Sequence, residues 1–333
     1  MFGDRKSITA FAALVFGLLA LVAMSARAVT VADLYEVTLP IEGNRETAFS
    51  EALKAVAVRV SGQRDAASRL GSAVNSPRQY VQRFAFTSDD QLQVAFDAGS
   101  IDRLLNGAGL PIWGRERPAT LVLLNVPAPD GLPTWLEANY PSPDRDALAR
   151  VAKQRGVPLV WPVLSPQDRS LLSGASSASA AELMQLARQF NANAVLLGQA
   201  RRDANGALNV HWTLASNDGV GEAHGALEAG AHLAADTFGR TYAASGTSLR
   251  SVSVEVAGID TLDDYAVALN YLEGMTLVRS VALEQVSGNK MRFALAVRGD
   301  ARTLRRALAL DNRLVPSGEN TPGTEGLQLR FQR

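Results

Sequence analysis

Apolar and polar residues alternate along the chain in patterns that predict a small number of strands and helices. Residues 34–41 alternate as in a strand, and the next helix carries an apolar stripe that ends at Gly62. A hairpin with its turn at residues 88–90 follows, and then a short helix. The first segment, residues 29–116, therefore has the order strand, helix, hairpin, helix.

The same order returns at residues 247–333. A strand precedes Thr261 and Asp264, which are spaced as a capping box at the start of a helix. A second hairpin turns at residues 287–289, and another helix follows it. We expect a second small α+β domain that is a diverged repeat of the first, with convergence on one layout as the alternative.

The middle segment, residues 117–246, has a different pattern. Residues 120–126 form the continuous apolar run typical of a strand buried on both faces. Helices are predicted after Ser142 and Ser179, and Asn205-Gly206 predicts a tight hairpin turn with positive φ at both positions. Strands that alternate with helices and end in a meander predict a central mixed-sheet α/β domain between two α+β domains.

The amino terminus predicts export. Arg5 and Lys6 precede an apolar run, residues 8–23, and Ala26 and Ala28 occupy the two positions that a signal peptidase reads. We expect a signal peptide over residues 1–28, with an uncleaved anchor as the alternative. The run is shorter than the roughly 20 residues that span a bilayer. No second apolar run has that length, so we expect no transmembrane segment in the mature chain.

Composition narrows the classes of partner. Thirty-three basic residues balance thirty-three acidic ones, so there is no electrostatic reason to expect nucleic acid. The chain has no cysteine, which excludes disulfides, thiolate metal sites and a cysteine nucleophile. Export without cysteine is compatible with the periplasm of a Gram-negative bacterium.

Two resemblances carry further expectations. Residues 36–40, 45–62 and 80–84 resemble an exported bacterial family known only as a domain of unknown function. The predicted helix over 181–190, the strand after Asn193 and the Asn205-Gly206 hairpin resemble the amino-terminal domain of the Tol translocation protein and related envelope lipoproteins. The domain order is also similar to that of the flagellar basal-body ring protein. These resemblances imply an envelope location and binding to other macromolecules.

No motif in the chain predicts catalysis, a cofactor or a metal. The three histidines, His211, His224 and His232, lack the helical pair spacing of metal ligands, and we interpret them as structural or solvent-facing. A site assembled by the fold is the alternative. Trp113, Trp161 and Trp212 lie in apolar or strand-forming surroundings and are predicted to be core or domain-junction residues.

One location predicts a binding surface. Ligands of open α/β sheets bind beyond the carboxyl ends of parallel strands, where the two long loops of the middle segment begin, residues 127–140 and 165–179. We predict that a partner binds where these loops meet, with Trp135 as apolar anchor and Arg169 as polar contact. The full predicted set is Asp130, Trp135, Gln167, Asp168 and Arg169. The alternative is two surface loops without a binding role.

The function that these patterns favour is non-catalytic binding or scaffolding in envelope assembly or maintenance, with unidentified envelope proteins as partners. Two alternatives stay open: a periplasmic hydrolase or transferase whose site the fold assembles, and a module that binds peptidoglycan through exposed tryptophans.

Overall fold

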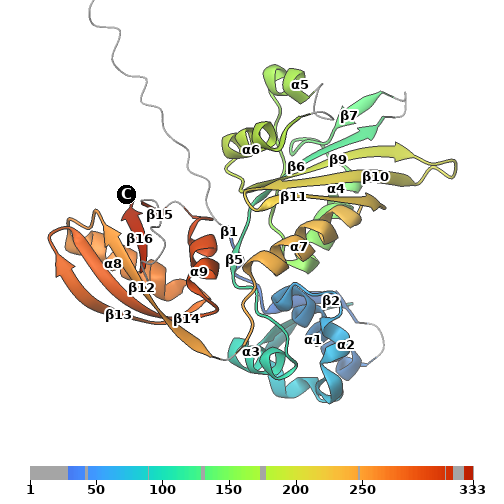
Figure 1. The fold of residues 1–333 in the computed structure, drawn as a ribbon. Coiled ribbons are helices and arrows are strands. Elements are labelled where there is room, and N and C mark those ends of the chain that lie inside the picture. Colours follow the sequence, from blue (N-terminus) through green and yellow to red (C-terminus); the bar gives the residue numbers. More distant parts are fainter. Residues whose placement is uncertain are drawn as a thin grey trace, which may run out of the picture.

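The computed structural model describes residues 29–41, 44–88, 90–128, 132–172, 178–246, 248–311, 313–317 and 326–332. The predicted signal peptide, with Ala26 and Ala28, lies outside these residues, and so does Asp130. No helix in this described part of the chain is both long and apolar enough to cross a membrane. The described residues form helices and four sheets, which confirms the predicted mixture of α and β structure (Figure 1).

The first segment packs a three-stranded antiparallel sheet against a long helix. Its elements are β2 (Glu36–Pro40), α1 (Arg45–Ser61), α2 (Ala66–Arg69), η1 (Gly71–Asn75), η2 (Pro77–Tyr80), β3 (Val81–Ser88), β4 (Gln91–Phe96) and α3 (Ala98–Gly107). Asn44 caps the start of α1, and Gly62 ends this helix in the left-handed conformation, with φ 73°. The strand order is β2-β4-β3, so both β2 and β3 are edge strands.

The middle segment is a mixed sheet with helices on both faces. Its elements are β6 (Thr120–Pro127), β7 (Pro133–Trp135), α4 (Pro143–Arg155), β8 (Leu159–Val160), α5 (Pro166–Leu172), α6 (Ala180–Gln189), β9 (Ala194–Arg202), β10 (Leu208–Ser216), β11 (Gly219–Gly225) and α7 (Ala229–Tyr242). The order is β11-β10-β9-β6-β7, and β6 pairs in parallel with both β8 and β9. Short strands β1 (Val29–Thr30) and β5 (Glu116–Arg117) form a separate pair.

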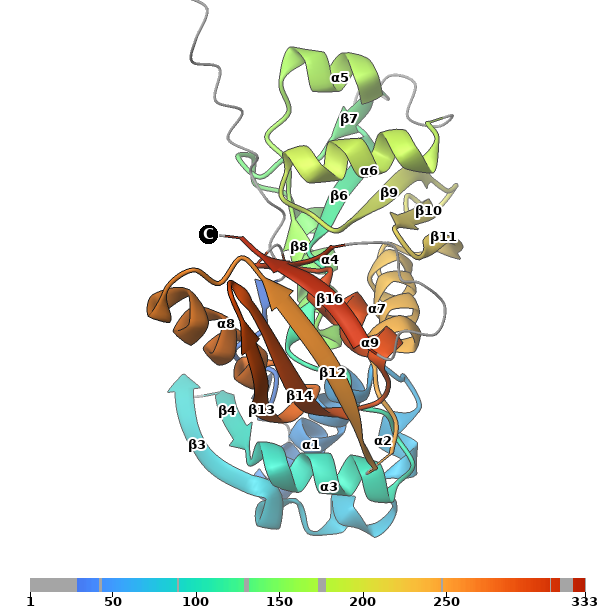
Figure 2. The ribbon, with the colours of Figure 1, turned by 60° about the vertical axis from the view of Figure 1, so that its left-hand side comes forward.

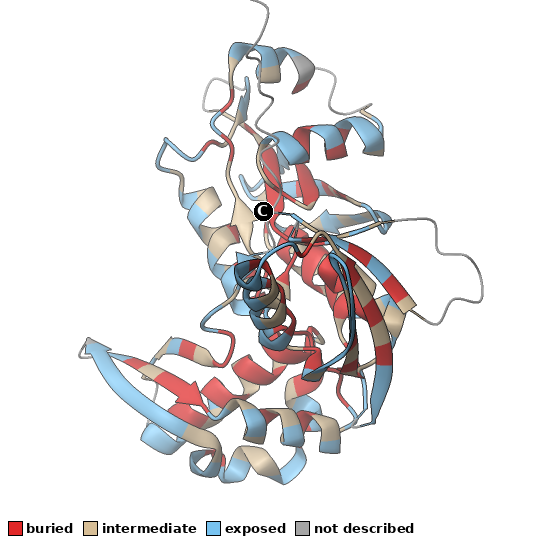
Figure 3. Ribbon diagram, turned by 90° about the vertical axis from the view of Figure 1, so that its left-hand side faces the viewer, coloured by how far each residue is buried: buried red, intermediate tan, exposed pale blue. Residues whose placement is uncertain are grey.

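Strand β6 is buried on both faces, as its continuous apolar run predicts. Val122 and Leu124 pack with α4 and α7, whereas Leu121 and Leu123 pack with α6 on the opposite face. Figure 3 shows this distribution, with buried residues between the layers and exposed residues on the outer faces of the helices. The capping residues Ser142 and Ser179 begin α4 and α6 as predicted.

Two local predictions in this segment were wrong. The β9–β10 hairpin exists, but residues 203–207 connect its strands, and within this connection the Asp203 carboxylate accepts hydrogen bonds from the N–H groups of Asn205 and Ala207. Gly206 has positive φ and Asn205 does not. The predicted loop at 165–179 contains α5.

The last segment repeats the element order of the first and adds two strands. Its elements are β12 (Leu249–Ala257), α8 (Leu262–Gly274), β13 (Val278–Ser287), β14 (Lys290–Arg298), α9 (Ala301–Leu308), β15 (Leu314–Pro316) and β16 (Gly326–Phe331). The sheet order is β13-β14-β12-β16-β15. Figure 2 shows β13, β14, β12 and β16 side by side. In both segments the second hairpin strand lies between the first strand and its hairpin partner. This agrees with the predicted repeat of layout, and a common origin stays a prediction.

Polar contacts join the three segments. Arg298 of β14 pairs with Asp102 of α3 at 3.2 Å, and the Asn193 side chain donates to the Leu310 carbonyl. The division into domains at residues 116 and 246 stays a prediction.

Candidate functional site

The loops that were predicted to bind a partner lie side by side. Glu137, which is only 5% exposed, accepts a hydrogen bond from Arg169 at 2.5 Å and another from the Leu164 N–H at 2.9 Å. The Ala138 N–H also donates to the Pro162 carbonyl. Because β6 and β8 are parallel neighbours, their carboxyl ends bring both loops to one edge.

Most of the predicted contact residues in this rim take part in internal contacts. Trp135 is half-buried and packs against the core cluster beneath α6. Asp168 accepts from the N–H and hydroxyl of Ser165 at the start of α5. Arg169 is held by Glu137, and Gln167 is exposed. The partner-binding role of this rim stays a prediction, and its polar side chains are less available than the sequence indicates.

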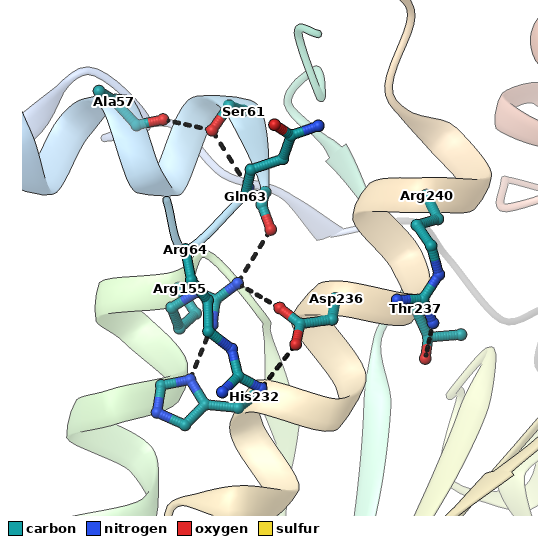
Figure 4. Close-up of polar contacts among 10 residues, drawn as sticks. Ala57, Ser61, Gln63, Arg64, Arg155, His232, Asp236, Thr237 and Arg240 are labelled. Atoms are coloured by element: carbon teal, nitrogen blue, oxygen red, sulfur yellow. Dashed lines mark hydrogen bonds and ion pairs between the residues drawn. The ribbon is translucent and has the colours of Figure 1, made fainter. Parts of the chain in front are cut away.

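A polar network joins the carboxyl-terminal ends of α1 and α4 to His232 and Asp236 of α7 (Figure 4). Arg155 is 3% exposed and donates to the Gly62 carbonyl at 2.9 Å and to Asp236 at 2.8 Å. Arg155 also lies 2.7 Å from His232 Nδ1, and Arg64 donates to the other Asp236 oxygen at 2.6 Å. The network couples the first segment to the middle one through one carboxylate.

The network lowers the pKa of both His232 and Asp236. Burial is the largest influence on His232, and together with Arg64 and Arg155 it lowers the pKa of this imidazole. Burial alone would raise the pKa of Asp236, but hydrogen bonds and charge from the same two arginines outweigh it and lower that pKa. The site therefore favours a neutral His232 beside an ionised Asp236.

Two further arginines are buried in cages of backbone carbonyls. Arg117 is fully buried, stacks over Trp113 at 3.5 Å, and donates to the carbonyls of Trp113 and Arg59 at 2.7 and 3.2 Å. Arg59 donates to the carbonyls of Asp33 and Glu36 and to that of Gln154, on α4. Burial lowers the pKa of both guanidinium groups. These contacts hold β2 and α1 at a defined distance from α4.

A groove with a cavity volume of about 830 Å³ lies between β2, α1 and α4. Its size is within the range of ligand sites in proteins, roughly 300–1,000 Å³. Lys54 of α1 and Lys153 of α4 line it and pair with Glu51 and Asp33 at 2.7 and 4.0 Å. Arg150 also lines the groove, is exposed, and has no ionic partner within the described residues.

One wall of the groove is the edge of β2 that pairs with no other described strand. The Tyr35 carbonyl accepts from Phe96 of β4, whereas the Glu36 carbonyl accepts from Arg59, on the opposite side of the strand. Backbone groups alternate in direction along a strand, so Thr38 directs its N–H and carbonyl to the groove, as Glu36 does. Pro40 has the same phase, and its missing N–H is tolerated at a strand edge of this kind.

The sequence interpretation overlooked a cross-strand pair of histidines. His211 of β10 and His224 of β11 are register partners, and their rings stack at 4.2 Å with an interplanar angle of 16°. Glu222 Oε2 lies 3.8 Å from His211 Nε2, and one ligand atom from each of these three residues lies within 4.8 Å of the others. A two-residue turn at 217–218 already implies this pairing, because it sets 211 opposite 224. The helix-spacing test could not detect it.

Comparison with known families matches residues 28–114 to a domain of unknown function, DUF8605. This range is about a quarter of the chain and contains β2 and α1, two walls of the groove. No curated protein and no solved structure matches the chain.

Proposed function

We propose that this chain is a periplasmic binding protein without catalytic function, and that the groove beside β2 holds an extended segment of another envelope protein. The observation that most directly supports this proposal is the free edge of β2 inside a concave site of about 830 Å³. An extended chain added to such an edge gains backbone hydrogen bonds, and the surrounding side chains select its sequence. Arg150, which has no ionic partner among the described residues, favours a segment with an acidic side chain.

The proposal includes export by the signal peptide and a three-domain arrangement with boundaries at 28, 116 and 246. Three core clusters, each drawn almost entirely from one segment, and a fourth beneath α6 support this arrangement. The proposal also includes the resemblance of the middle segment to the Tol amino-terminal domain, with which a mixed sheet covered by helices is compatible.

Replacing Thr38 by proline tests the groove, because the substitution removes a backbone donor that faces the cavity. Proline is tolerated at sheet edges, so we expect Thr38→Pro to fold. A photo-reactive amino acid at Gln154, which is exposed and also lines the groove, should crosslink the partner in living cells, and mass spectrometry should identify it.

The matched control is Thr38→Ala, which removes the side chain but keeps the N–H. We expect Thr38→Pro to lose at least about 90% of the crosslinked product, since added strands depend on backbone bonds, and Thr38→Ala to keep it. Equal crosslinking by both variants, or no crosslinked protein with the parent chain, would contradict the proposal.

A periplasmic hydrolase or transferase is the second candidate, and the convergence of His211, Glu222 and His224 favours it. The side chains of these residues are exposed, and two of them, His211 and Glu222, line a cavity of about 240 Å³. Turnover of wall-derived compounds by the purified protein would establish it. The glycan-binding alternative has less support, because two of the four tryptophans are fully buried and the others are half-buried. Pull-down with purified sacculi tests it.

A further inference from the structure

The β10–β11 hairpin carries two of the three histidines of the chain directly opposite each other. Alternation along both strands places His211, Glu222 and His224 on one face. About 43% of the His211 side chain and 60% of the Glu222 side chain are exposed, so both can change rotamer without disturbing the core. The third histidine, His232, is part of the Arg155 network and lies elsewhere.

We propose that His211, His224 and Glu222 bind one divalent transition-metal ion, with zinc as the preferred class. Imidazole and carboxylate are ligands that Zn²⁺ favours, at about 2.0–2.2 Å from the ion. Tetrahedral geometry at that length sets ligand atoms about 3.3–3.6 Å apart. The three ligand atoms lie within 4.8 Å of one another, and one pair is at 3.8 Å. Rotamer changes at exposed side chains can close the remaining difference.

The surroundings of the three ligands suit a site with an open coordination position. His211 and Glu222 line a cavity of about 240 Å³ between the sheet and the beginning of α6. Gln199 and Thr213 line the same cavity, and Gln199 is the register partner of His211 on β9. Three protein ligands leave a fourth position for water or a small anion, and polar neighbours can orient the imidazole that binds the ion.

The test is titration of the full chain, purified without a histidine tag, with Zn²⁺ by calorimetry and with Co²⁺ by visible absorption. We expect one equivalent of Zn²⁺ to bind in the micromolar range or tighter, and Co²⁺ to produce ligand-field bands. His211→Gln and His224→Gln should each weaken binding at least about tenfold, because each removes one of three ligands. Circular dichroism should show that both variants keep their secondary structure.

His232→Gln is the matched control, because it makes the same substitution at the remaining histidine, and Asn209→Ala alters the exposed surface of β10 nearby. Both should bind zinc as the parent chain does. Absence of binding by the parent chain at 100 µM Zn²⁺, roughly the weak limit of a specific site, would overturn the proposal. Unchanged binding by the His211→Gln/His224→Gln double variant, or an equal loss in His232→Gln, would also overturn it. The outcome is independent of the β2 groove, which Thr38→Pro tests separately.

Discussion

We predict that replacing Gly198 by alanine destabilises the protein, because Gly198 lies against the ring of Trp212. Trp212 of β10 is fully buried, with Gly198 as its register partner on β9 and Gly230 of α7 also against its ring. A Cβ atom on Gly198 would lie 2.4 Å from Trp212 Cζ3 and 2.8 Å from Leu124 Cδ1. Carbon atoms prefer separations of about 3.5–4.0 Å, so the indole would have to move by more than about 1 Å.

The indole cannot retreat easily, because a Cβ on Gly230 would lie 2.6 Å from the same ring. Overpacking of this kind costs about 1–3 kcal/mol and occasionally more, and we expect Gly198→Ala to lower the free energy of unfolding by about 3 kcal/mol. With an m-value of about 2–3 kcal/mol/M, the urea midpoint should fall by about 1–1.5 M. Urea unfolding followed by circular dichroism measures this shift.

Two further variants make the reasoning refutable. A Cβ atom on Gly107 would meet no neighbouring part of the chain within 4 Å, so Gly107→Ala should leave stability unchanged or raise it by up to about 1 kcal/mol. Trp212→Phe shortens the ring, so the double variant Gly198→Ala/Trp212→Phe should be more stable than the sum of the two single effects, by at least about 1 kcal/mol. Additive effects, or an unchanged midpoint for Gly198→Ala, would show that the packing argument is wrong.

Two other predictions concern the junction between the first and middle segments. Burial, Arg64 and Arg155 lower the pKa of His232 from its ordinary 6.5, so below that pH the unfolded chain binds a proton that the folded chain resists. The free energy of unfolding should therefore decline as the pH falls below 6.5. His232→Gln should flatten this decline, measured by thermal unfolding, and an identical decline in the variant and the parent chain would refute the reasoning. Arg117→Met leaves several buried carbonyls without a donor and should cost at least about 3 kcal/mol in thermal unfolding, whereas the exposed Arg115→Met should change stability by under about 1 kcal/mol.

Local features of the fold could be predicted because their causes lie within a few residues. Ser142 and Ser179 accept bonds from backbone groups three residues later, and Gly62 ends α1 by adopting a conformation that other residues resist. The apolar run of β6 predicts burial on both faces without reference to any partner. The pairing of His211 with His224 follows equally from a short turn, and a register argument would have found it.

The groove and the buried arginines depend on contacts between distant segments. Arg59, Arg117 and Arg155 resemble surface residues in the sequence, since their carbonyl and carboxylate partners come from as far as 95 residues away. The parallel pairing of β12 with β16 likewise joins strands with no local signal between them. Burial of a charge is decided by whether folding supplies enough acceptors at one point. Patterns of neighbouring residues do not contain that information, because it arises when the segments pack.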